Sequence, residues 1–271
     1  MSLRRISVTT VIFLFALPLM AGNPYRLRYG AAETGMGTVT LTNPHFTGFF
    51  QNQALLAYNN SLGLGVNYES RFNLKELSFA SFGCIVPFSG GSLGAVYSQY
   101  GTTDLRRIFG GIAIGLELGE RVAGGVQIDY IGENVYDGYN DTHAVTFEIG
   151  TALKLNEKTT FGANIFNPLP QQLRNSYLPS SISLGVGSYI SDKVFLAAES
   201  LLTTGERIVV KTGFQFEVVR NLLLRGGYTT ENNSFCFGVG YRLKPIKIDF
   251  SFLAHESLGR SSSISLLFLF N

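Results

Sequence analysis

Apolar and polar residues alternate in short segments along most of this chain, from Ser61 to its C-terminal end. Within 234–243, for example, Phe235, Phe237, Val239 and Tyr241 alternate with small or polar residues. A period of two places neighbouring side chains on opposite faces of a β-strand. In a membrane β-barrel one face meets lipid and the other a polar lumen. A soluble β-sandwich would turn its apolar faces inward, so alternation alone leaves both architectures open.

The alternation predicts fourteen strands, an even number, as in bacterial single-chain barrels. The predicted strands cover residues 62–69, 75–86, 92–100, 107–118, 122–131, 143–155, 159–166, 181–190, 194–202, 206–218, 222–229, 234–243, 246–253 and 262–270. The second and third strands alternate poorly, so we expect a bulge or a misplaced strand edge there.

The connections between the predicted strands differ in length on the two sides of the sheet. Every second connection is short, namely 89–91, 119–121, 156–158, 191–193, 220–221 and 244–245. The intervening connections are mostly longer, such as 132–142 and 167–180. Short turns at one end and longer loops at the other are typical of outer-membrane barrels. We therefore predict an all-β fold, a closed, antiparallel, fourteen-stranded transmembrane β-barrel over residues 61–271.

Composition and aromatic placement agree with this architecture. The chain has 31 Gly, 13 Tyr and 22 Phe, with 15% charged residues. Glycines suit crowded, bent strands, and aromatic rings suit the two membrane interfaces. Aromatic residues of the lipid-facing parity occur at both strand ends: Tyr68, Tyr130 and Tyr228 at the long-loop end, and Phe216, Tyr241 and Phe270 at the short-turn end. A net charge of +2 without a basic patch makes nucleic acid an unexpected partner.

The N-terminus has the features of a secretory signal peptide. Arg4 and Arg5 precede an apolar run from Val11 to Met20, and Ala21 is a small residue suited to the cleavage site. A membrane-anchoring helix is the alternative, but spanning a bilayer needs about 20 apolar residues. We predict a signal peptide over residues 1–21 and location in the bacterial outer membrane.

The two cysteines, Cys84 and Cys236, fall in the second and twelfth predicted strands. Export would permit a disulfide bond, but these strands would not be neighbours, so two unpaired residues are the preferred interpretation. Neither cysteine has metal-ligand spacing to another Cys or His, and the sequence indicates no cofactor.

Charged residues on the lumen parity nearly balance in sign. They are Glu117, Asp129, Glu148, Glu199, Glu217 and Asp249, with Lys154, Lys211, Arg225, Arg242 and Lys247. A pore selective for one ion sign would be lined mainly by the opposite charge. Ion pairs that make a narrowed lumen rigid and a generic wet barrel wall are equally good interpretations.

Residues 22–60 precede the first strand and are too long for a simple tail. They are apolar and glycine-rich, but they lack the Lys-Ser/Thr and helix of a phosphate-binding loop. We expect this segment to fold into the lumen as a plug.

In this segment the chain resembles a known family. The residues that carry the resemblance are Gly30-Ala31, Gly35-Met36-Gly37 and Asn52-x-Ala54-x-Leu56-Ala57, with further matches at 71–77, 97–101, 164–168 and 255–259. The pattern is similar to FadL-type transporters of hydrophobic compounds, and more so to their Bacteroidota relatives, the PorV/PorQ-type barrels. The resemblance covers essentially the whole mature chain.

This resemblance implies a fourteen-stranded barrel with a short N-terminal hatch inside. It assigns the hatch motif to Gly35, Met36, Gly37, Asn52 and Ala54. Fatty-acid transporters carry Asn-Pro-Ala where this chain has Asn52-Gln53-Ala54. The short chain implies reduced external loops.

Three functions remain as hypotheses. The first is binding or transport of a hydrophobic small molecule across the outer membrane, with Phe46, Phe49 and Phe50 lining an apolar pocket or simply packing the plug. The second, implied by the PorV/PorQ resemblance, is a component or partner of the type IX protein secretion system. Outer-membrane lipid is an expected partner in both.

The third hypothesis is an outer-membrane lipid hydrolase. His255-x-Ser257 is similar to the His-x-Ser arrangement of lipid A deacylase barrels, where a His activates a weak Ser nucleophile. However, the pair lies in a predicted loop, and its surroundings match the non-enzymatic family. His45 and His143 offer no better partner, so we predict that the protein is not an enzyme.

Overall fold

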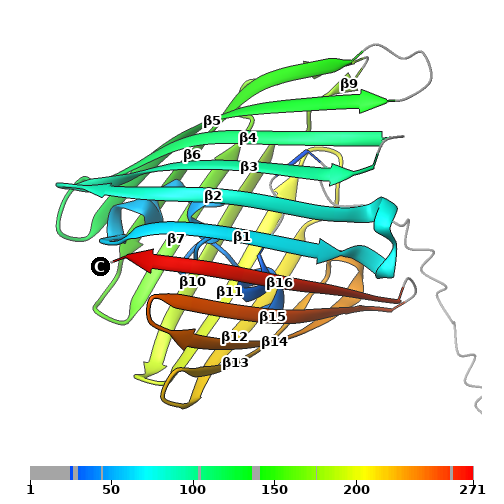
Figure 1. The fold of residues 1–271 in the computed structure, drawn as a ribbon. Coiled ribbons are helices and arrows are strands. Elements are labelled where there is room, and N and C mark those ends of the chain that lie inside the picture. Colours follow the sequence, from blue (N-terminus) through cyan, green and yellow to red (C-terminus); the bar gives the residue numbers. More distant parts are fainter. Residues whose placement is uncertain are drawn as a thin grey trace, which may run out of the picture.

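Fourteen strands of the chain close into one antiparallel barrel (Figure 1). This computed structural model describes residues 25–26, 30–43, 45–102, 105–135, 141–174, 176–256 and 259–270. Each barrel strand pairs with the barrel strands that precede and follow it along the chain, and the first strand pairs with the last. The predicted fold is therefore confirmed.

The barrel strands are β1 (Leu62–Ser70), β2 (Ser78–Phe88), β3 (Gly91–Gly101), β4 (Leu105–Glu117), β5 (Val122–Val135), β6 (Thr142–Lys154), β7 (Thr159–Phe166), β10 (Ser181–Ser191), β11 (Val194–Thr203), β12 (Val209–Val219), β13 (Leu222–Thr229), β14 (Ser234–Leu243), β15 (Ile246–His255) and β16 (Gly259–Phe270). A separate two-stranded sheet joins β8 (Gln172–Leu173) to β9 (Ser176–Tyr177), inside the connection between β7 and β10. Three short 3-10 helices lie at the long-loop end: η3 (Arg71–Asn73), η4 (Lys75–Leu77) and η5 (Glu231–Asn233).

The expected irregularity near the second strand is a misplaced edge. Strand β2 begins at Ser78, three residues later than predicted, because the residues before it form η4. No register shift separates β2 from β3 within their described pairing. The shifts occur instead at Tyr189/Ser191 and Glu217/Val219, both next to short turns.

All six predicted short turns are present, and one predicted long connection at the opposite end is shorter than expected. Strand β5 continues to Val135, which shortens the predicted connection 132–142. Strand pairing with β4 therefore includes residues 132–135 of that connection.

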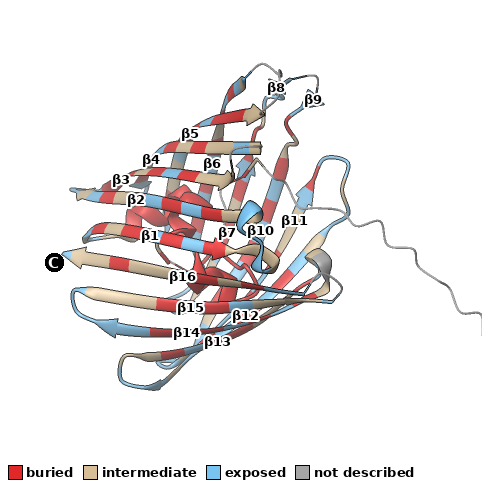
Figure 2. Ribbon diagram, turned by 45° about the vertical axis from the view of Figure 1, so that its right-hand side comes forward, coloured by how far each residue is buried: buried red, intermediate tan, exposed pale blue. Residues whose placement is uncertain are grey.

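Buried and more exposed residues alternate along many of the barrel strands (Figure 2), and many of the exposed residues are large and apolar. Ile112, Ile128 and Phe237 are 71%, 63% and 61% exposed. Tyr68 and Tyr130 lie exposed at the long-loop end, and Phe270 at the short-turn end. This surface suits hydrocarbon bounded by two aromatic belts. Cys84 and Cys236 are both free. Among the described residues, no helix has the length and apolar character needed to cross a membrane.

The chain between Gly30 and Tyr58, called here the inner segment, lies inside the barrel. It contains α1 (Ala31–Gly35), η1 (Gly48–Phe50) and η2 (Gln53–Tyr58), and nearly all its described residues are buried. Helix α1 packs beside β13–β16, and η2 packs beside β3–β6. The inner segment therefore crosses the lumen from one side of the wall to the other.

Candidate functional site

Polar wall side chains hold the first half of the inner segment. The backbone N–H groups of Thr40 and Leu41 both donate to Glu199 Oε1, at 2.5 Å each. On the neighbouring strand, Lys211 Nζ donates to the Thr38 carbonyl at 3.2 Å. These bonds satisfy backbone groups that would otherwise be buried without a partner. The charges of Glu199 and Lys211 therefore position the inner segment.

The motif residues Gly35, Met36 and Gly37 form the end of α1. Gly37 has a φ of +71°, and a Cβ there would collide with the carbonyl oxygen of Thr212, so only glycine fits this position. Met36 is fully buried, and its sulfur lies 3.4 Å from His45 Nε2. The motif therefore ends the helix in direct contact with β12, β13 and β14.

Asn52 connects three parts of the structure. Its Nδ2 donates to the Leu41 carbonyl at 2.7 Å and to the Thr151 carbonyl on β6 at 3.1 Å. Its Oδ1 accepts from the N–H of Ala54 at 3.3 Å and so caps the start of η2. Asn52 is 0% exposed. One amide therefore fixes η2 to the rest of the inner segment and to the wall.

Glycines in the wall allow η2 to approach the strands closely. A Cβ at Gly115, Gly125 or Gly150 would collide with the backbone of Gln53 or its neighbours. Ala54, fully buried, lies against this surface. Backbone therefore packs on backbone, and little free space remains on this side of the lumen.

The predicted lumen charges occupy two different environments. Asp129, Glu148, Glu199, Lys211, Arg225 and Asp249 are buried, whereas Glu117, Glu217 and Arg242 lie at the short-turn end and are partly or largely exposed. Arg225 Nη1 and Asp249 Oδ1 are 2.7 Å apart, and Lys247 Nζ lies 3.3 Å from Asp249 Oδ2. Arg225, Lys247 and Asp249 thus form ion pairs rather than a wet, one-sign lining.

A second polar cluster lies between the inner segment, β6 and β7. Glu148 Oε2 accepts from Gln53 Nε2 and from Asn164 Nδ2, at 3.1 Å each. Arg26 Nη2 donates to Asn164 Oδ1 at 2.6 Å and lies 3.8 Å from Glu148 Oε2. Sequence reasoning assigns no role to Arg26 or Gln53, because no pattern in the sequence indicates their contact with Glu148. The path of the inner segment brings Gln53 to this wall, and Arg26, which precedes that segment, reaches the same carboxylate.

A cavity of about 710 Å³ lies at the short-turn end of the lumen. Its apolar lining includes Phe46, Phe49 and Ile85, together with Leu267 and Leu269 of β16. Its charged lining consists of Arg242, Lys244 and Lys247, with no acidic residue among the described lining residues. Because Lys244 and Pro245 are exposed, solvent reaches this cavity at the turn between β14 and β15.

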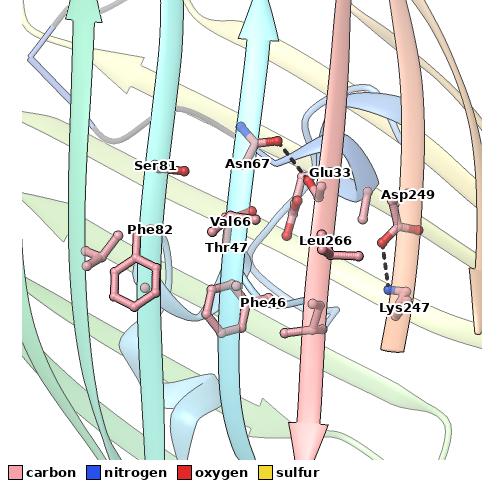
Figure 3. Close-up of a pocket in the computed structure, with 16 residues that line it drawn as sticks. Glu33, Phe46, Thr47, Val66, Asn67, Ser81, Phe82, Lys247, Asp249 and Leu266 are labelled. Carbon is pink, nitrogen blue, oxygen red and sulfur yellow. Dashed lines mark hydrogen bonds and ion pairs between the residues drawn. The ribbon is translucent and has the colours of Figure 1, made fainter. Parts of the chain in front are cut away.

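A much smaller pocket of about 20 Å³ lies on the other side of Phe46, between β1, β2 and β16 (Figure 3). The two spaces share Phe46, Lys247 and Leu267 in their linings. The smaller one has room for little more than a water molecule. The Phe46 ring rests on Gly65, where the absence of a side chain leaves space for it. Only the larger space can hold an organic molecule.

The three candidate ligand-binding phenylalanines are close together but differ in access. Phe46 and Phe49 line the large cavity, whereas Phe50 is fully buried beside Gly94. The rings of Phe46 and Phe50 meet edge to face, with centroids 6.0 Å apart. Phe50 therefore supports the cavity wall from behind.

The histidines show no catalytic arrangement in the described structure. Burial, together with the cations Lys247, Arg225 and Arg242, holds the pKa of His45 well below its usual value, so its ring is neutral. Ser257, the proposed partner of His255, lies outside the described residues. The described part of the chain contains no cluster of three His, Cys, Asp or Glu residues that could hold a metal ion.

Comparisons with solved structures find the same barrel. The chain is similar to the monoaromatic hydrocarbon channel CymD, with 14% identity, a TM-score of 0.71 and coverage of 89% of this chain and 97% of that one. It is also similar to the Pseudomonas putida toluene transporter TodX, with 13% identity, a TM-score of 0.70 and coverage of 90% of this chain and 99% of that one. A Pseudomonas aeruginosa FadL homologue has 10% identity and a TM-score of 0.65, with coverage of 90% of this chain and 98% of that one. At these low sequence identities, the similarity to these structures concerns the fold alone. No family model matches the chain, and no curated protein matches its sequence.

Proposed function

We propose that this protein spans the bacterial outer membrane and provides a path across it for a hydrophobic small molecule. The cavity at the short-turn end carries the proposal. Its volume suits a small organic ligand, because ligand pockets commonly enclose about 300–1,000 Å³. The fold shared with hydrocarbon channels and transporters supports the same function.

The inner segment is the proposed plug, and the cavity is the proposed binding site next to it. Phe46 and Phe49 belong to the inner segment, so the ligand would contact the plug directly. The lining favours a ligand with an apolar body, and the cations Arg242 and Lys244 tolerate a polar or anionic end. Residues 1–21 would be removed after export, and 22–60 would form the hatch.

A substitution that fills the cavity tests this proposal. Leu269→Trp would place a large ring in the cavity, whereas Ile264→Trp adds the same ring to the outward face of the same strand. Binding of a fluorescent apolar probe to the purified protein should weaken about tenfold in Leu269→Trp, a loss of about 1.4 kcal/mol. Ile264→Trp should bind the probe as the unmodified protein does.

Equal probe binding by Leu269→Trp and Ile264→Trp would refute the proposal that the ligand binds in this cavity. Purification of the protein with secretion components and without any bound lipid-like molecule would favour the alternative, a partner of the type IX secretion system.

A further inference from the structure

Two carboxyl groups face each other in the middle of the lumen wall with no solvent contact. Asp129 on β5 and Glu148 on β6, called here the acid pair, are both 0% exposed. Glu148 pairs in register with Gln127, two residues from Asp129 on the same face of β5. The two side chains are therefore diagonal neighbours within hydrogen-bonding reach.

In each carboxyl group of the acid pair, one oxygen accepts a hydrogen bond and the other has no hydrogen-bond donor. Asp129 Oδ1 accepts from Gln127 Nε2 at 2.7 Å, and Glu148 Oε2 accepts from Gln53 and Asn164. Asp129 Oδ2 and Glu148 Oε1 are buried without a partner. Ionised carboxylates only accept hydrogen bonds, so two of them cannot bond to each other. One proton on either group supplies the missing donor.

The balance of buried charges also indicates that the acid pair holds one proton. Among the described residues, Arg26 is the cation that faces the acid pair, at 3.8 Å from Glu148. The next acid, Glu199 on β11, is occupied by Lys211 and by two backbone N–H groups of the inner segment. Two ionised carboxylates beside one guanidinium would leave a buried net charge, which is costly. With one proton bound, the cluster is neutral.

We propose that Asp129 and Glu148 share one proton and that this proton controls how firmly the inner segment is held. Glu148 also binds Gln53, at the start of η2, and Arg26. Loss of the proton would add a negative charge at this anchor and draw water toward it. The inner segment should therefore loosen as the pH rises. Whether this loosening lets a ligand pass through the lumen rests on the proposed function, in which the inner segment closes the lumen.

Amide hydrogen exchange tests the proposal on the purified full-length protein without any ligand. Exchange of the amides in 50–57, corrected for the intrinsic effect of pH, should become at least tenfold faster between about pH 6 and about pH 9, where buried carboxyl groups can titrate. In Asp129→Asn a permanent N–H donor replaces the proton, so corrected exchange should be independent of pH. Asp192→Asn, in an exposed turn, should behave like the unmodified protein.

Either of two results would overturn the proposal: corrected exchange independent of pH in the unmodified protein, or an unchanged pH dependence in Asp129→Asn. Should Asp129→Asn fail to fold, Glu148→Gln provides the same comparison. A change in exchange on adding a chelator at constant pH would indicate a bound metal cation and would also refute the shared proton. Because no ligand is present, this outcome is independent of whether the protein transports anything.

Discussion

Replacement of Asn52 by alanine should release the inner segment from the wall. The substitution removes the hydrogen bonds to the carbonyls of Leu41 and Thr151 and the cap on the N–H of Ala54. Each buried backbone group left without a partner costs about 1–3 kcal/mol. Because the Thr151 carbonyl is only partly buried, we expect a total of about 3 kcal/mol, which raises the open population about a hundredfold.

Labelling of a reporter cysteine measures this population. Ala57 is 4% exposed in η2, so Ala57→Cys should react with a maleimide only when the segment opens. Cys84 and Cys236 are replaced by alanine in this background, so that they do not react. Adding Asn52→Ala should increase the labelling rate about a hundredfold. Asn156→Ala, in an exposed turn where Asn156 bonds only to nearby backbone, is the matched control. A less than twofold difference between these two variants would refute the anchoring role of Asn52.

Three further changes test other parts of the account. Deleting 22–60 should raise single-channel conductance and the leak of small polar solutes, and conductance equal to that of the intact chain would contradict a plug. His255→Ala should leave the physiological activity intact, and loss of a lipid-hydrolysing activity in this variant would revive the enzyme hypothesis. Arg225→Met should reduce the free energy of unfolding by about 1.5–3 kcal/mol because Asp249 loses a charged hydrogen bond at 2.7 Å and keeps Lys247 as its ionic partner. In denaturant titrations, an unchanged midpoint in this variant would refute the role of the Arg225–Asp249 pair.

The barrel could be predicted from the sequence because its signal is local. A two-residue period and a short turn are visible within about ten residues, so strand limits and pairing order follow directly. Errors arose where no alternation exists. The residues before β2 form a short 3-10 helix, and the connection after β7 contains the small β8–β9 sheet, neither of which has a periodic pattern.

The candidate site was harder to predict from the sequence, because its contacts join residues that are far apart along the chain. The inner segment has no dominant period, so its path could not be deduced, although the resemblance drew attention to Asn52 and Gly37. That path takes Gln53 to Glu148, and Arg26, which precedes the inner segment, contacts the same carboxylate. Phe46 and Phe49 line the cavity while Phe50 does not, a distinction that depends on side-chain direction within a single turn.

Uptake of radiolabelled toluene by cells that produce the protein in an outer membrane rich in lipopolysaccharide tests the central claim most directly. The unmodified protein should increase toluene entry over cells that lack it, Leu269→Trp should abolish most of the increase, and entry of a sugar of similar size should not change. Toluene entry that is the same with and without the protein, or an equal increase for toluene and the sugar, would contradict a path for hydrophobic molecules.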